Sequence, residues 1–148
     1  MADSVSTTTT DVDAKPSLSL NTKVSIGGAN FSQGQRQLIA MARALLRRSS
    51  IIVLDEATSS IDFATDAKIQ ATIRKEFSNS QLLTVAHRLR TVIDYDRLIV
   101  LDKGQIVEFD TPWNLINKTD GVFRNMCLKS GSFGELELAA KAKAELLA

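Results

Sequence analysis

The chain has 148 residues, 44% of them hydrophobic, and its 18 Lys and Arg residues nearly balance its 17 Asp and Glu residues. This length suits one domain or a large part of one, and the net charge of +1 argues against a nucleic-acid-binding or basic membrane-binding surface. A single cysteine, Cys127, excludes an internal disulfide and is typical of a reducing compartment. The sequence shows neither an apolar run of about 20 residues that could span a membrane nor a signal peptide.

Residues 1–20 are rich in Ser, Thr and Asp and show no apolar periodicity, so we interpret them as a disordered or linker segment. Gly27 and Gly28 indicate a loop. A helix is predicted from Ser32, because Ser32 and Gln35 have the spacing of a capping box. Apolar residues then recur every three or four positions, which gives this helix one apolar face.

Two short apolar runs predict strands. Residues 51–54, Ile-Ile-Val-Leu, are typical of a parallel strand that is buried on both faces. Asp62 is a plausible cap for a helix that continues to Phe77. Residues 82–86 then predict a second buried strand, which ends at His87.

The remaining sequence predicts further helices and a hairpin. These are a helix at 89–93, strands at 98–101 and 105–109, a helix that starts at Thr111-Pro112, and a last helix over much of 135–147. Strands and helices alternate, which favours an α/β fold with a mainly parallel sheet and flanking helices. Ligands of such folds bind beyond the carboxyl ends of the strands.

Two predicted strands end in residues that can do chemistry. Asp55 and Glu56 follow the first strand, where one carboxylate can hold Mg²⁺ beside nucleotide phosphates and its neighbour can orient or deprotonate water. His87 follows the second strand, where an imidazole can contact a terminal phosphate. Taken singly, a solvated acidic turn and a surface or core histidine are the commoner interpretations.

A third candidate is the stretch FSQGQ, which opens the first predicted helix. The free amides and the positive dipole end of a helix N-terminus suit an anion. Ser32 adds a hydroxyl, and Gly34 allows close backbone approach. Ser32 could equally serve only as a helix cap, and both roles are compatible. Trp113, Met126 and Cys127 are interpreted as packing residues.

The order of these motifs resembles that of the ATP-binding cassette (ABC) ATPase family. FSQGQ resembles the signature motif of that family, and the resemblance implies that Ser32, Gln33, Gly34 and Gln35 contact nucleotide. Each motif alone has low specificity, but four of them in this order are highly specific.

The other three motifs follow in the order of the family. IIVLDE resembles the Walker B strand, which implies that Asp55 lies on the metal side and that Glu56 is the catalytic carboxylate. SSID resembles the D-loop and adds Asp62 to the nucleotide-binding residues, and TVAHR places His87 as the switch histidine. The implied cofactors are ATP and Mg²⁺.

The resemblance covers roughly residues 20–130. Stretches such as NFSQGQRQLIAMARALLRR are similar to the second nucleotide-binding domain of subfamily C, the multidrug-resistance-associated exporters, and the tail resembles fungal members. Glu56 favours the second domain, because first domains of that subfamily often lack this glutamate. The predicted organisation is a linker at 1–20, the C-terminal portion of a nucleotide-binding domain at 21–130, and a helical tail at 131–148.

The sequence contains no GxxxxGK[ST], so the Walker A half of the fold, with its phosphate-binding loop and lysine, is missing. We therefore interpret the chain as a partial P-loop NTPase fold and expect no ATP hydrolysis by the isolated chain. The Walker B strand of the family lies beside the strand that leads to the P-loop. Without that neighbour, uncovered apolar faces and strand edges predict marginal stability or aggregation.

The resemblance implies an ATP-binding and ATP-hydrolysing part of an exporter. Its partners would be a second nucleotide-binding domain, arranged head to tail, and transmembrane domains, and no nucleic acid. It would be membrane-associated on the cytoplasmic face of a vacuolar or plasma membrane. The alternatives are a non-enzymatic half-site partner or regulator of another domain, a chromosome-maintenance or repair ATPase, and a truncated product without function.

Overall fold

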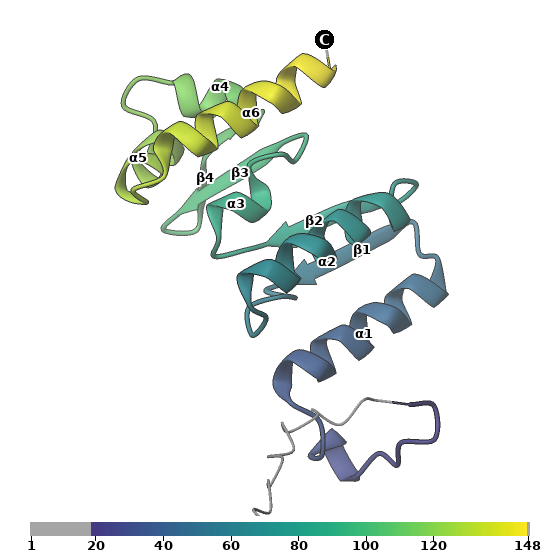
Figure 1. Ribbon diagram of the computed structural model, residues 1–148. Coiled ribbons are helices and arrows are strands. Elements are labelled where there is room, and N and C mark those ends of the chain that lie inside the picture. The colour runs from purple at the N-terminus through teal and green to yellow at the C-terminus, as the bar shows by residue number, and fades with distance from the viewer. Residues whose placement is uncertain (1–18, 148) are drawn as a thin grey trace, which may run out of the picture. The chain divides into compact units, whose positions relative to one another are not determined.

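The computed structural model describes residues 19–147 and divides into two units, residues up to Ser32 and residues from Gln33 onward (Figure 1). Residues 1–18, most of the predicted linker, lie outside the described residues. The first unit contains the short 3-10 helix η1 (Ile26–Gly28). Both Gly27 and Gly28 have φ of +68°, which confirms the predicted loop and explains why glycine occurs there.

The second unit begins with two helices and a pair of parallel strands. These are α1 (Gln33–Arg47), β1 (Ile51–Asp55), α2 (Phe63–Glu76) and β2 (Gln81–Val85). The predicted start of α1 directly after Ser32 is confirmed, whereas its capping box stays a prediction. The cap of α2 is also confirmed, because the Asp62 carboxylate accepts a hydrogen bond from the Thr65 amide at 3.0 Å.

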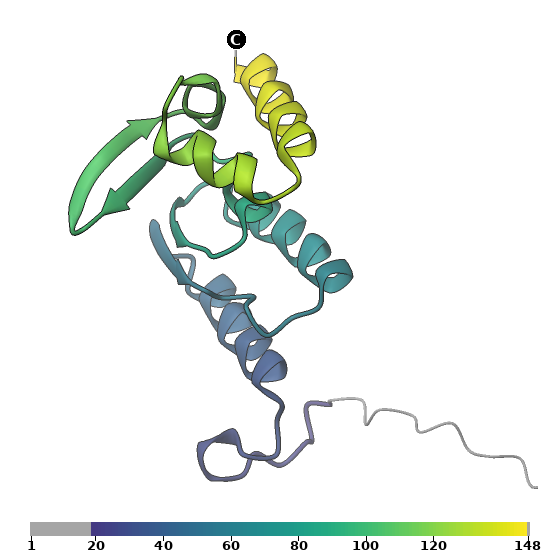
Figure 2. The same ribbon diagram turned by 90° about the vertical axis from the view of Figure 1, so that its left-hand side faces the viewer.

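Helices α1 and α2 cover one face of the β1–β2 pair (Figure 2). The core on that face consists of Ile52 and Leu54 from β1 together with Ile73 and Phe77 from the end of α2. Apolar residues of α1 pack against this core. Every second residue of β1 is therefore buried, because successive side chains of a strand point to opposite faces.

The predictions that β1 is buried on both faces and that β2 is a buried strand are wrong. Ile51 and Val53 are 64% and 62% exposed, and Leu83 and Val85 of β2 are each 53% exposed. Both strands carry apolar residues on each face, but the described elements cover only one. The second face therefore remains an open apolar surface, which agrees with the expectation that apolar faces are left uncovered.

The rest of the chain forms a second cluster. It comprises α3 (Leu89–Val92), β3 (Leu98–Asp102), β4 (Gln105–Asp110), α4 (Pro112–Asn117), α5 (Val122–Lys129) and α6 (Phe133–Leu147). Helices α4, α5 and α6 gather beside the β3–β4 hairpin (Figure 1). The buried core of this cluster is made of Ile93, Leu98, Val100, Leu115, Ile116, Phe123, Cys127, Leu136 and Ala140.

Most predictions for this cluster are confirmed. The hairpin turns at Lys103 and Gly104, which both have positive φ, as a two-residue turn of the type I′ class requires. Pro112 opens α4, and the Thr111 hydroxyl accepts from the Asn114 amide at 3.2 Å. The α/β class is confirmed, although the described strands form one parallel and one antiparallel pair instead of a single, mainly parallel sheet.

The three predicted packing residues differ in their environment. Cys127 is fully buried, and burial raises the pKa of its thiol to about 11, so the thiol is inert at neutral pH. Trp113 packs against the same core. Met126 is 48% exposed and does not belong to this core, so its prediction as a packing residue is wrong.

Candidate functional site

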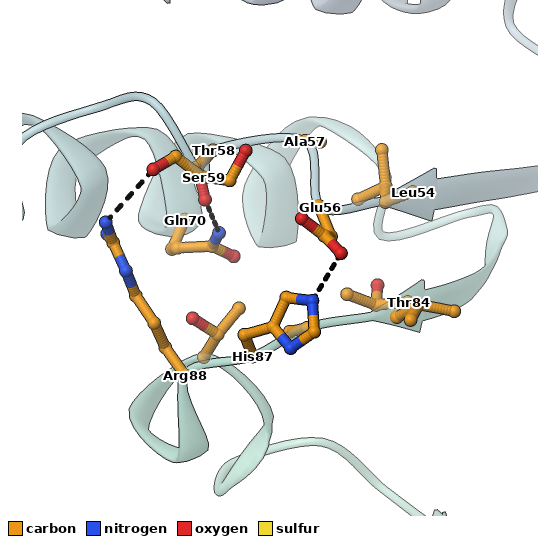
Figure 3. A pocket seen from close by; sticks show the side chains of 12 residues that line it. Leu54, Glu56, Ala57, Thr58, Ser59, Gln70, Thr84, His87 and Arg88 are labelled. Carbon is orange, nitrogen blue, oxygen red and sulfur yellow. Dashed lines mark hydrogen bonds and ion pairs between the residues drawn. The ribbon is translucent and has the colours of Figure 1, made fainter.

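The parallel pairing of β1 and β2 brings two predicted site residues together. Asp55 pairs with Val85 at the last position of the register, and the Glu56 amide donates to the Val85 carbonyl at 2.9 Å. The chain beyond each strand then turns so that His87 Nε2 contacts Glu56 Oε1 (Figure 3). The two side chains come from positions 31 residues apart, at the carboxyl edge where the sequence predicted a ligand site.

Glu56 has an unusual backbone conformation for a residue other than glycine. Its φ is +46°, in the left-handed region, which costs on the order of 1–3 kcal/mol and persists only where the surroundings hold the residue in place. Hydrogen bonds hold the residue on both sides, since its amide donates to Val85 and its carbonyl accepts from the Ser59 amide at 3.0 Å. This conformation turns the chain away from β1 directly at Glu56, the residue that carries the carboxylate.

Glu56 and His87 lie at the edge of a small cavity of about 130 Å³ (Figure 3). The turn after β1, the end of β2 and Gln70 of α2 supply the other walls. The Gln70 amide group donates to Thr58 Oγ1 and to Asp66 Oδ1, both at 3.3 Å. Its oxygen is the one buried side-chain polar atom without a hydrogen-bond partner among the described residues. A cavity of this volume has room for water beside that acceptor.

Arg88, next to His87 in the sequence, also holds the turn after β1 in place. It forms an ion pair with the buried Asp66 of α2 at 2.9 Å and donates to the carbonyl of Ile61 at 3.1 Å. Its guanidinium also lies 4.7 Å from the centre of the Phe63 ring. Two neighbouring residues after β2 therefore contact both ends of the turn, His87 at Glu56 and Arg88 near Ile61.

Asp55 occupies a different position from Glu56. It is exposed, and by the alternation of β1 it belongs to the same face as Ile51 and Val53, the open face of the pair. No cluster of three or more metal-binding side chains occurs among residues 19–147. A single carboxylate is nonetheless the protein contribution that fits Mg²⁺ held mainly by water and nucleotide phosphates.

The predicted signature residues lie at the start of α1. Gln33, Gly34 and Gln35 form its first turn, and Ser32 precedes it. Gly34 lies directly on the predicted D-loop stretch, because a Cβ at this position would be 3.3 Å from the Ser60 carbonyl oxygen. The structure thus brings part of the predicted signature motif against the turn that follows Glu56.

Asp62 does not line the cavity. Its carboxylate caps α2, and the hydrogen bond from the Thr65 amide lowers its pKa. The interpretation of this residue as a cap is confirmed, and its predicted contact with nucleotide stays a prediction.

Sequence reasoning did not single out several residues that shape the site, namely Gln37, Thr58, Asp66, Gln70 and Arg88. Their contacts join segments that are 12 to 29 residues apart, except for the pair Asp66 and Gln70. The available signals were weak, because Arg88 merely adjoins His87 and Gln37 lies two residues beyond the FSQGQ stretch.

One known family model matches part of this chain. Residues 3–59 match the family model described as ABC transporter, a range that starts within the segment interpreted as a linker. The chain is 55% identical over 131 residues to the ATP-dependent bile acid permease of Saccharomyces cerevisiae. It is also 53% identical over 126 residues to a pleiotropic ABC efflux transporter of multiple drugs from Candida glabrata. The chain belongs to the ABC transporter family.

These matches cover 88% and 84% of this chain, yet the chain spans only about 8% of the length of either relative. A solved structure, that of a bacterial Atm1-family ABC exporter with ATP bound, is 34% identical, with a TM-score of 0.64. That likeness covers 70% of this chain and 18% of the exporter chain. It confirms the fold of an ABC exporter nucleotide-binding domain. Within the described residues, no helix has the length and apolar character to cross a membrane.

Proposed function

We propose that this chain supplies the C-terminal part of an ATP-hydrolysing domain of an ABC exporter, with Glu56 as the catalytic carboxylate and His87 as its partner. The observation that carries this proposal is the contact between His87 Nε2 and Glu56 Oε1 at the carboxyl edge of β1 and β2. A carboxylate and an imidazole in contact can together position a water molecule and a terminal phosphate.

In this proposal, Glu56 orients or deprotonates the attacking water, because its carboxylate is 42% exposed and so reachable from solvent. His87, with 75% of its side chain exposed, can leave Glu56 and contact the terminal phosphate. Asp55 would hold Mg²⁺ on the open side of β1. Mg²⁺ beside the phosphates neutralises the charge that develops in phosphoryl transfer.

The remaining parts of the site come from outside these residues. The sequence contains no GxxxxGK[ST], so a P-loop must be contributed by another segment or chain. We propose a head-to-tail partner domain, toward which Ser32, Gln33, Gly34 and Gln35 supply the signature contacts to nucleotide. We further place the chain in the second nucleotide-binding domain of a subfamily C exporter.

The relatives support an export role at the level of the whole transporter. Their names describe bile acid transport and multidrug efflux, and we propose organic anions or conjugates as the substrate class. Transmembrane domains would recognise that substrate, with this chain on the cytoplasmic face of a vacuolar or plasma membrane. Glu56 and His87 would act only on nucleotide.

A chimera tests the catalytic roles. The matching segment of the S. cerevisiae bile acid permease is replaced by residues of this chain, and ATP hydrolysis is measured in purified transporter. We expect Glu56→Gln to lower turnover at least a hundredfold with ATP binding retained, and His87→Ala to lower turnover strongly as well. Asp120→Asn, far from the site in sequence, serves as the matched control. Normal hydrolysis in Glu56→Gln would refute the assignment of Glu56.

A further inference from the structure

Gln37 of α1 directs its whole amide group at the turn that follows β1. Its nitrogen donates to Ser59 Oγ at 3.1 Å and to the Glu56 carbonyl at 3.3 Å. Its oxygen accepts from the Ser60 amide at 3.4 Å. One half-buried side chain therefore bonds to both the first and the last residue of the stretch Glu56–Ser60.

Gly34 provides an independent observation one helical turn earlier. Residues three positions apart share one face of a helix, so Gly34 and Gln37 face the same segment. The close approach of Gly34 to the Ser60 carbonyl leaves no room for a side chain without displacement. The start of α1 thus lies directly on this turn at two points, one by backbone packing and one by hydrogen bonds.

The turn needs such support because Glu56 has a left-handed backbone conformation. A shift of its carbonyl would rotate the peptide plane and redirect the carboxylate that contacts His87. Gln37 is the one side chain for which a hydrogen bond to the Glu56 carbonyl is found in the described part of the chain. Its contacts hold Glu56 from α1, in addition to the backbone hydrogen bond from the Glu56 amide to Val85 of β2.

We propose that Gln37 is a positioning residue for Glu56, and that it couples the first turn of α1, with Gln33, Gly34 and Gln35, to the catalytic carboxylate of the same chain. This inference rests on the proposed function, which assigns catalysis to Glu56. Nucleotide contact at the signature turn is thereby linked to the orientation of Glu56 through a single amide side chain.

The test uses Gln37→Met in the permease chimera, because Met keeps the length of the side chain and removes all three hydrogen bonds. We expect kcat to fall about ten- to a hundredfold, with the KM for ATP unchanged within about twofold. Gln105→Met, the same change at an exposed residue of β4, is the matched control and should leave both constants unchanged. A kcat close to that of the parent, or a rise in KM alone, would overturn the proposal.

A second readout does not depend on turnover. Hydrogen–deuterium exchange of the same chimeras is followed in peptides that span residues 56–61 and 112–129. Gln37→Met should speed exchange about tenfold or more in the first peptide, which contains the Ser60 amide, and leave the second unchanged. Unchanged exchange at 56–61 would contradict the positioning role. Faster exchange in both peptides would indicate general unfolding, and Gln37→Glu, which retains an acceptor for Ser60 but loses both donors, then replaces Gln37→Met with the same expected loss of kcat.

The two proposals fail in different ways. A folded parent chimera that binds ATP but does not hydrolyse it would refute the proposed function, while the exchange measurement would still decide whether Gln37 holds the turn. A parent that hydrolyses ATP with a Gln37→Met variant of equal kcat would refute only the role of Gln37.

Discussion

The cluster from α3 to α6 and the region from α1 to β2 are stabilised by different interactions. The first, here called the C-terminal cluster (residues 89–147), has a core of nine buried residues, which come from β3, from the helices α4, α5 and α6, and from Ile93 directly after α3. The second, here called the site region (residues 33–88), has a core of four buried residues. In the site region, ion pairs and side-chain hydrogen bonds hold the turn after β1 in place.

The larger apolar core and the predicted site residues lie in different regions of this chain. The C-terminal cluster contains none of the predicted site residues, whereas all the predicted site residues that lie after Ser32 belong to the site region. A site must keep polar groups accessible and backbone strain in place, which limits how much apolar area the same segment can bury. The open face of β1 and β2 adds apolar surface that no described element covers.

The largest expected effect is in the C-terminal cluster. Phe123 is 3% exposed in its core, so Phe123→Ala should lower the free energy of unfolding by about 3–5 kcal/mol. Val53→Ala, on the open face of β1, should change it by less than about 0.5 kcal/mol. Urea denaturation followed by fluorescence of Trp113, the single tryptophan, measures both. Equal losses in the two variants would contradict the comparison.

The site region should respond most to loss of the ion pair between Arg88 and Asp66. Arg88→Met leaves the buried Asp66 carboxylate without its cation and frees the Ile61 carbonyl, which should cost about 2–3 kcal/mol locally. Exchange should become faster in a peptide that spans residues 57–66. A peptide over α5 should keep its protection, and a loss of protection there would show that the two regions unfold as one.

A smaller effect is expected at Glu108, which caps α5 from β4. Burial opposes its ionisation, but bonds from the Phe123 amide, Lys118 and the Val122 amide outweigh burial and lower its pKa below the ordinary 4.5. Because the folded state favours the carboxylate, this stabilisation is present above about pH 4.5 and is lost as pH falls through the lowered pKa. Glu108→Gln should therefore cost about 1 kcal/mol at pH 7.

The pH dependence provides the control for that prediction. The difference in unfolding free energy between the unsubstituted chain and Glu108→Gln should shrink when both are measured by urea denaturation at a pH well below 4.5. Glu145→Gln, in an exposed pair with Lys141, should cost almost nothing at either pH. A Glu108→Gln difference that stays constant with pH would show that charge is not its cause.

Local sequence signals predicted most of the elements. Asp62 and Thr111 cap α2 and α4 from the position directly before each helix, and the Lys103-Gly104 turn follows from its own backbone preferences. Helix α5 was not predicted. Gly121 offers no side-chain cap, and the carboxylate that accepts from the Val122 and Phe123 amides belongs to Glu108, 14 and 15 residues earlier. A signal of that kind is visible only after the chain has folded.

The burial of β1 and the surroundings of Glu56 show the same limit. The apolar run of β1 indicates what the strand can bury, but which face is covered depends on the packing of α1 and α2. The meeting of Glu56 and His87 was predictable, because parallel strands end at the same edge. The braces from Gln37 and Arg88 were not, since they reach the turn from 19 to 29 residues away.

The most direct test of the account compares ATP turnover at saturating Mg²⁺ and ATP in the permease chimera and in the isolated 148-residue chain. The account predicts turnover by the chimera that depends on Glu56, and none by the isolated chain, which contains no P-loop sequence. Glu56-dependent turnover by the isolated chain would contradict it. So would a folded chimera that binds ATP and does not hydrolyse it.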